Sequence, residues 1–124
     1  MAELEEIKDS ILDTTKKMLG FDRSYTAFDL DILTHINSTF FTLQQIGIGP
    51  SKGFVITDRE ATWPNYLVGD DISAVKSYMF LKVRMMFDPP TTSFANEAIK
   101  AQITELEWRL NVQSEGRMNL DDIE

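Results

Sequence analysis

The chain has 124 residues, 43% of them hydrophobic and 26% charged, and its formal net charge is −8. This composition fits one globular domain and is too apolar for general disorder, while the acidic balance disfavours tight binding to nucleic acid or an anionic membrane. The absence of cysteine excludes disulfides and thiolate zinc sites.

The amino-terminal residues predict a helix in a protein of a cytosol-like compartment. They carry acids where a signal peptide would carry bases, and no apolar run in the chain approaches the ~18 residues of a membrane span. Apolar positions follow the helical period over residues 3–19, and Gly20 is a natural stop. We therefore expect the first helix over residues 3–19 and no association with a membrane.

The second predicted helix starts near residues 26–29 and runs to residue 46. Its apolar stripe is Ile32, Ile36, Phe40 and Leu43. The following glycines and Pro50 should end it abruptly.

A long connection over residues 47–69 separates the second and third helices. Loops of this length are uncommon in compact domains and are usually functional. We expect a short strand at residues 53–57 and a helical turn at 63–67 that returns two aromatic side chains to the core. The candidate loop contacts are Phe54, Trp63 and Tyr66.

The last two helices form a hairpin around a double proline. The third helix should run from residue 70 or 71 to 87, where Pro89-Pro90 forces a stop. The fourth should begin after residues 91–93 and reach about residue 112. Residues 114–124 are polar and lack a helical period, so we expect an extended tail. The predicted fold is all-α: a bundle of about four helices (domain 1–113) with a long central loop and a tail (114–124).

No residue pattern predicts catalysis, and we expect no metal and no cofactor. His35 is the only histidine, and a helix-surface role beside Asp31 is much the simpler interpretation. The glycine-rich segment after the second helix follows a helix rather than a strand, and Pro50 removes a donor that a phosphate cradle would need. Glu105 and Glu107 lie two residues apart and so point to different helix faces. Asn37 begins a glycosylation sequon without an accompanying secretion signal.

Two arginines and four aromatic residues leave alternatives open. Arg84 and Arg109 could pair with an acid such as Glu105 along a helix rim, or form an ion pair that orients the hairpin or holds a neighbouring subunit. The aromatic residues fit either the core or an interface, where aromatic residues concentrate: Trp63, Tyr66, Tyr78 and Trp108.

Several short motifs occur in a fixed order along the chain. They are His35-Ile36-Asn37-Ser38, Gly47-Ile48-Gly49-Pro50 with Gly53-Phe54, Trp63, Leu81-Lys82-Val83-Arg84 through Phe87-Asp88-Pro89-Pro90-Thr91, and Glu105-Leu106-Glu107-Trp108-Arg109-Leu110-Asn111. In this order they resemble the head–tail connector (adaptor) proteins of long-tailed bacteriophages, in the branch from phages of Gram-positive hosts. The resemblance spans about residues 10–113.

The resemblance implies a non-enzymatic virion protein, assembled in the host cytoplasm. Such proteins form a ring, typically twelve-fold, under the portal protein, where they extend the DNA channel and offer a platform to a stopper or tail-completion protein. The implied contacts between subunits or within the hairpin are Arg84, Asp88, Trp108 and Arg109. The tail would dock on the portal through Arg117, Met118, Asn119, Leu120 and Ile123.

The charge agrees with this implied role. Twelve copies at −8 amount to about −96, and an acidic lumen repels phosphates, so DNA passes without specific binding. An alternative of another class is a small acidic helical regulator that binds a host protein as a DNA mimic.

Overall fold

The computed structural model describes the backbone of residues 7–123 and the side chains of residues 7–116. Within this part the protein is all-α, as predicted, and contains no strand. Its helices are α1 (Ile11–Met18), α2 (Asp29–Ile46), α3 (Trp63–Tyr66), α4 (Ile72–Phe87) and α5 (Ser93–Ile123).

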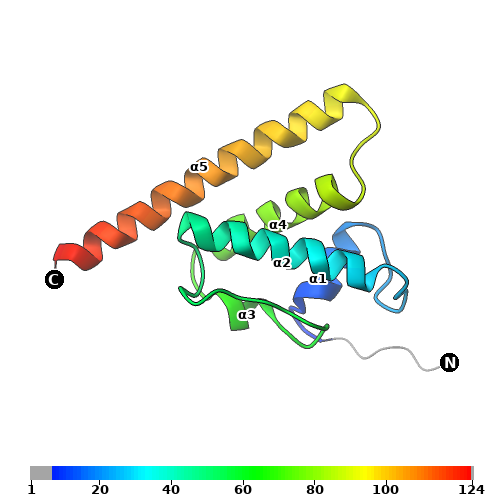
Figure 1. The fold of residues 1–124 in the computed structure, drawn as a ribbon, viewed down its shortest axis with the longest axis horizontal. Coiled ribbons are helices and arrows are strands. Elements are labelled where there is room, and N and C mark those ends of the chain that lie inside the picture. Colours follow the sequence, from blue (N-terminus) through cyan, green and yellow to red (C-terminus); the bar gives the residue numbers. More distant parts are fainter. Residues whose placement is uncertain (1–6, 124) are drawn as a thin grey trace.

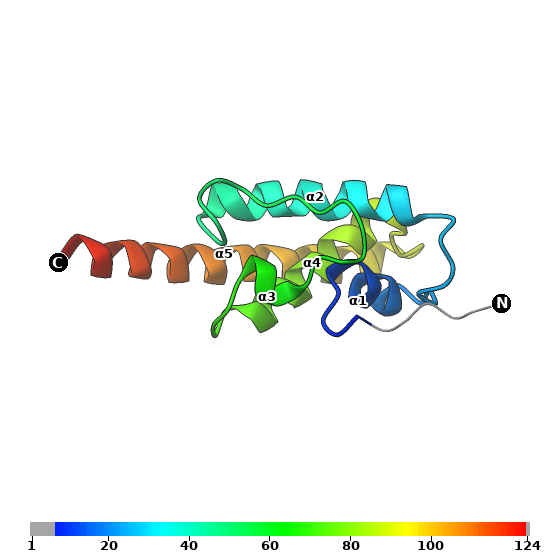
Figure 2. The ribbon, with the colours of Figure 1, turned by 90° about the horizontal axis from the view of Figure 1, so that it is seen from below.

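Helix α4 lies at the centre of the bundle, where it packs against α2 on one side and α5 on the other. Figure 1 shows α5 along one edge and the connection between α2 and α3 along the opposite edge. Figure 2 shows α1 and α3 on the side of α4 away from α2, and α5 extending beyond the bundle at its carboxyl end.

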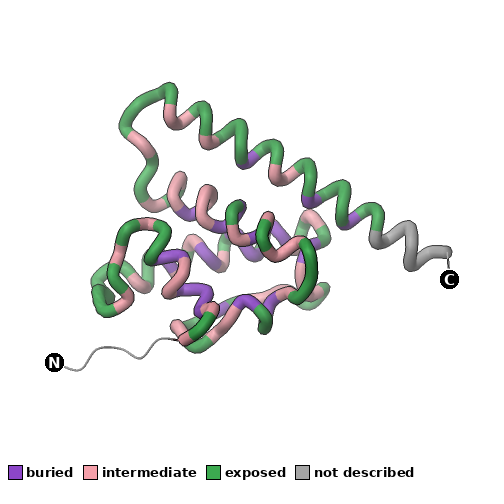
Figure 3. Tube along the Cα trace, turned by 180° about the vertical axis from the view of Figure 1, so that it is seen from behind, coloured by how far each residue is buried: buried purple, intermediate pink, exposed green. Residues whose placement is uncertain are grey.

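One hydrophobic core joins all five helices, and buried positions follow the inner faces in Figure 3. In α5 these positions are Ile103 and Leu110, with Ile99 and Leu106 packed against the core. Their spacing of three and four residues places them on one helix face. The opposite face of α5 is therefore left to solvent.

The predicted ends of α2 and α4 are confirmed. Gly47 ends α2 with φ 100°, a left-handed conformation that glycine adopts without steric cost. Helix α4 ends at Phe87, and Asp88 leads into the double proline. In the next turn, the hydroxyl of Thr92 accepts a hydrogen bond from the backbone N–H of Ala95 at the start of α5.

The first helix is shorter than predicted. It begins at Ile11 after the N-cap Ser10. Asp9 has a positive φ of 62°, a value that a right-handed helix does not contain, so the helix does not extend back through Asp9. The backbone N–H of Trp63 bonds to the carbonyl oxygen of Asp9 at 3.0 Å, and that of Ile11 bonds to the carbonyl oxygen of Ala61. Hydrogen bonds to a distant segment therefore replace the predicted helical ones at residues 7–10; residues 3–6 lie outside the described part.

The predicted strand at residues 53–57 is wrong, whereas the predicted helical turn is confirmed as α3. A strand needs a neighbouring backbone for its hydrogen bonds. At this point the nearest partner is a side chain of α2, as described below.

The prediction of an extended tail is also wrong, because α5 continues without interruption through Ile123. The expected boundary at residue 113 thus falls inside a helix. Ser114 is 5% exposed, and its hydroxyl donates to the carbonyl oxygen of Gly47 at 3.2 Å. Adding residues to a formed helix costs little compared with nucleating one, so a segment without apolar periodicity can still extend it.

Candidate interaction surfaces

The first half of the connection is fastened to α2 by a side-chain clamp. The amide nitrogen of Asn37 donates to the carbonyl oxygen of Ile56 at 2.9 Å, and its amide oxygen accepts from the N–H of Ile56 at 2.8 Å. Two turns further along, Gln44 donates to the carbonyl oxygen of Ser51 at 3.1 Å. Both polar groups of a buried residue, Ile56, are thereby satisfied without a strand.

The second half of the connection is fastened to α1. Oδ2 of Asp13 lies 2.9–3.0 Å from two nitrogens of Arg59, and the hydroxyl of Ser10 donates to the carbonyl oxygen of Arg59 at 2.7 Å. The indole N–H of Trp63 donates to the hydroxyl of Thr14 at 3.0 Å. These bonds hold the connection at both ends, so it presents an ordered surface rather than a loose loop.

The aromatic residues of the connection mostly fill the core. Trp63 is 2% and Tyr66 is 5% exposed, so the structure places these two candidate contact residues inside the protein. The ring of Tyr66 lies 4.5 Å from that of Phe40 and 5.1 Å from that of Phe54. Burial raises the pKa of the Tyr66 phenol. Of the three candidates, only Phe54 keeps partial exposure.

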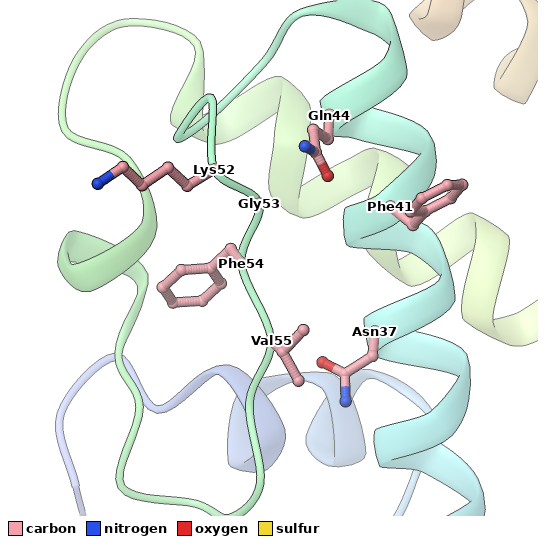
Figure 4. A pocket seen from close by; sticks show the side chains of 7 residues that line it. All are labelled: Asn37, Phe41, Gln44, Lys52, Gly53, Phe54 and Val55. Carbon is pink, nitrogen blue, oxygen red and sulfur yellow. The ribbon is translucent and has the colours of Figure 1, made fainter.

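An open pocket of about 380 Å³ lies between α2 and the connection (Figure 4). Its lining residues are Asn37, Phe41, Gln44, Lys52, Gly53, Phe54 and Val55. Two of them are strongly exposed hydrophobic residues: Phe41 at 59% and Val55 at 71%. No titratable group other than Lys52 lines it, so the pocket resembles a contact surface more than a catalytic cleft.

The candidate hairpin residues separate into different environments. Arg109 pairs with Glu105 at 2.8 Å on the exposed surface of α5, which is the simpler of the two interpretations left open by the sequence. Arg84 is half-buried, and its Nε has no hydrogen-bond partner. Asp88 is exposed, and its backbone N–H closes α4 by bonding to the carbonyl oxygen of Arg84 at 2.8 Å.

A polar contact missed from the sequence joins the two hairpin helices. The phenol of Tyr78, which is fully buried in α4, donates to Oε2 of Glu107 in α5 at 2.7 Å. Burial and this carboxylate together raise the pKa of Tyr78. Tyr78 and Glu107 stand 29 residues apart, and no local pattern in the sequence pairs them.

Helix α5 carries an exposed apolar stripe that the sequence analysis also missed. Trp108 is 67% exposed, so it belongs to the surface and not to the core. Phe94 is 86% and Val112 46% exposed. The sequence contains a second series of apolar residues with helical spacing in α5, and this series lies on a different face from the buried residues.

The remaining expectations concern His35, the sequon, metal binding, the membrane and the carboxyl-terminal docking residues. His35 is half-buried with its ring 6.3 Å from that of Phe87, and Asn37 of the sequon is occupied by its bonds to Ile56. No cluster of three or more potential metal ligands occurs among the described residues, and none of their helices is long and apolar enough to cross a membrane. The side chains of Arg117, Met118, Asn119, Leu120 and Ile123 lie outside the described part, although their backbone belongs to α5.

The fold and its surfaces therefore define a small helical protein whose exposed features suit contacts with other macromolecules. The family model described as phage connector protein matches residues 11–117. The chain belongs to this family, and its role is that of a structural phage connector protein. No curated protein and no solved structure matched the chain.

Proposed function

We propose that the protein is a subunit of a ring in the neck of the phage particle, beneath the portal protein. The ring extends the DNA channel and joins the head to a stopper or tail-completion protein. The observation that carries this proposal is the family match over residues 11–117, which spans α1 to α4 and most of α5. We expect the ring to assemble in the host cytoplasm and to contain about twelve copies of the protein.

The charge of the chain supports a conduit that does not hold DNA. Each subunit contributes −8, so a ring of many copies surrounds its channel with a strongly negative field. Affinity for DNA comes largely from neutralised phosphates. An acidic wall therefore leaves the DNA free to pass in either direction.

The far end of α5 supports a docking role toward the portal. Ser114 makes the last described contact of this helix with the core, and the helix then continues to Ile123 beyond the bundle (Figures 1 and 2). A projecting helical end can reach a surface that the bundle cannot. The docking residues remain those proposed from the sequence, at positions 117–120 and 123.

Two truncations separate docking from folding. A chain that ends after Gly116 keeps Ser114 and should unfold at the same temperature as the full chain, but it should be missing from purified particles. A chain that ends after Gln113 also loses the contact with Gly47 and should be less stable by about 1 kcal/mol. Normal incorporation of the chain that ends after Gly116 would contradict the docking role.

The test of the function itself is a phage that cannot make this protein. Such a phage should produce DNA-filled heads and free tails that do not join, and supplying the protein in trans should restore infectious particles. Electron microscopy and titration of the lysate measure both outcomes. If joined particles form without it, the protein is not a connector, and inhibition of a host nucleic-acid-binding protein becomes the function to assay.

A further inference from the structure

The outward face of α5 has the spacing of a helix–helix contact. Its exposed residues recur at alternating intervals of four and three, which is the period of a seam between two helices. We call this set the α5 stripe: Phe94, Ala98, Ala101, Glu105, Trp108 and Val112. It lies opposite the buried face of the same helix. Strongly exposed Phe and Trp side chains in one line mark a surface that another protein covers.

A second face with the same spacing, partly exposed, lies on α2. We call it the α2 face: Leu30, Thr34, Asn37, Phe41 and Gln44. Asn37 and Gln44 are half-buried where they bond to the connection, and the other three are exposed. Leu30 is 78% exposed and Phe41 is 59% exposed. Val55 of the connection, which lines the same pocket as Phe41, adds a third exposed apolar side chain (Figure 4).

The placement of these two surfaces fits successive copies of one chain. Helix α5 lies along one edge of the molecule, the connection that borders the α2 face lies along the opposite edge, and α2 and α5 run in the same direction along the long axis (Figure 1). Rotation about an axis along that direction brings α5 of one copy parallel to α2 of the next. A contact between two different surfaces of the same chain leaves one of each free, and it closes into a ring when the rotation allows.

The charges beside the two surfaces are complementary. Glu105 is the only charged residue of the α5 stripe, one turn before Trp108, and it forms an exposed ion pair with Arg109 at 2.8 Å, which can exchange partners at the surface. Lys52 is exposed at the edge of the pocket between α2 and the connection, and its side chain extends away from α2 in Figure 4. A parallel arrangement brings this end of the α5 stripe toward the same end of the α2 face, where opposite charges favour one register over others.

We infer that the subunit interface is formed by the α5 stripe of one copy on the α2 face of the next, with Trp108 seated near Phe41 and Val55. The inference rests on the proposed ring and specifies how its subunits meet. Aromatic side chains in the centre of an interface carry much of its binding energy.

The chain has no cysteine, so introduced thiols can test this contact in assembled particles. The variant Ala101→Cys with Thr34→Cys places one thiol on each surface, and both positions are exposed. A short bismaleimide should then link the full-length chain into a ladder of covalent oligomers on a denaturing gel. Co-assembly of the two single variants should stop at dimers. The control, Ala101→Cys with Ser77→Cys at an exposed position of α4, should give no ladder.

The outcomes separate the interface from the function. A neck ring that is visible in the same particles without a ladder from the first variant overturns the α5–α2 contact and leaves the connector function intact. Dimers formed by Ala101→Cys alone show α5 packed on α5 and also overturn the inference. Absence of any ring from the particles overturns the proposed function as well.

A charge placed in the stripe gives an independent measurement. Trp108→Glu lies on the surface and should keep the unfolding temperature within a few degrees, yet reduce incorporation into particles at least tenfold. The matched control, Gln102→Glu, adds the same charge to an exposed position off the stripe and should incorporate normally. Equal incorporation of the two stable variants overturns the inference.

Discussion

A buried lysine fixes the first helix against the start of the second. Nζ of Lys16 lies 2.8 Å from Oδ1 of Asp29 and donates to the carbonyl oxygen of Arg23 at 2.9 Å, and the lysine side chain is 1% exposed. Removing one partner of a buried pair costs about 3–5 kcal/mol. Because Asp29 keeps 26% of its surface in water, we expect Lys16→Met to lower the free energy of unfolding by about 3 kcal/mol.

Urea unfolding of the purified protein measures this change. Lys17→Met is the matched control, since Lys17 is exposed on the neighbouring position of the same helix. We expect that variant to stay within about 0.5 kcal/mol of the parent. Equal stabilities of the two variants would show that the pair does not hold α1 in place.

Tyr78 makes the stability of the protein sensitive to alkali. Burial and the carboxylate of Glu107 raise its pKa above the ordinary value of 10.0. The unfolded chain therefore loses this proton first, and the stabilising contribution that is complete below about pH 10 decreases as the pH rises above it. Tyr78→Phe should be less stable at pH 7 by about 1.5–3 kcal/mol, because it lacks the hydrogen bond to a charged group.

The pH dependence distinguishes ionisation from simple loss of packing. Unfolding free energies measured between about pH 9 and 11 should fall less steeply for Tyr78→Phe than for the parent. A smaller decrease should remain in the variant because the pKa of Tyr66 is also raised by burial. Identical slopes for parent and variant would contradict this role of Tyr78.

At the scale of elements, the clamp from α2 determines the shape of the connection. Asn37 satisfies both backbone groups of Ile56, which is 2% exposed. Asn37→Ala leaves these buried groups without partners, and we expect a loss of about 1–3 kcal/mol. Ser38→Ala, at an exposed position one residue along, is the control. Hydrogen exchange should show faster exchange of the Ile56 amide in the first variant alone; unchanged exchange would contradict the clamp.

The elements that the sequence predicts well are those with local causes. The ends of α2 and α4 follow from Gly47 and the double proline, which act through their own backbone geometry. The start of α1 and the absence of a strand at residues 53–57 depend on hydrogen bonds to distant segments. Helical periodicity carries no information about such partners.

The candidate surface could be predicted only in part for a similar reason. The sequence marks Trp63, Tyr66 and Trp108 equally as aromatic anchors, yet the first two are buried and the third is exposed. Their burial depends on which face of each element meets the core. For Trp108 it depends on how α5 is rotated about its own axis. The apolar stripe on the outer face of α5 can be recognised once that rotation is known.

At the scale of the whole molecule, the α5 stripe, the α2 face and the end of α5 occupy different parts of the surface. Helix α5 and the connection that borders the α2 face lie along opposite edges, and the end of α5 extends beyond the bundle (Figure 1). This separation allows a subunit to contact two neighbours and a third protein at the same time. The proposed subunit interface and the proposed docking of α5 would therefore use separate parts of the bundle.

Electron cryomicroscopy of the phage neck tests this account most directly. We expect a ring directly beneath the portal, with about twelve copies of a bundle in which α2, α4 and α5 fit the density and the end of α5 touches the portal. A neck whose density contains no copy of this fold, in particles that are complete and infectious, would contradict the assignment of the protein as a connector subunit.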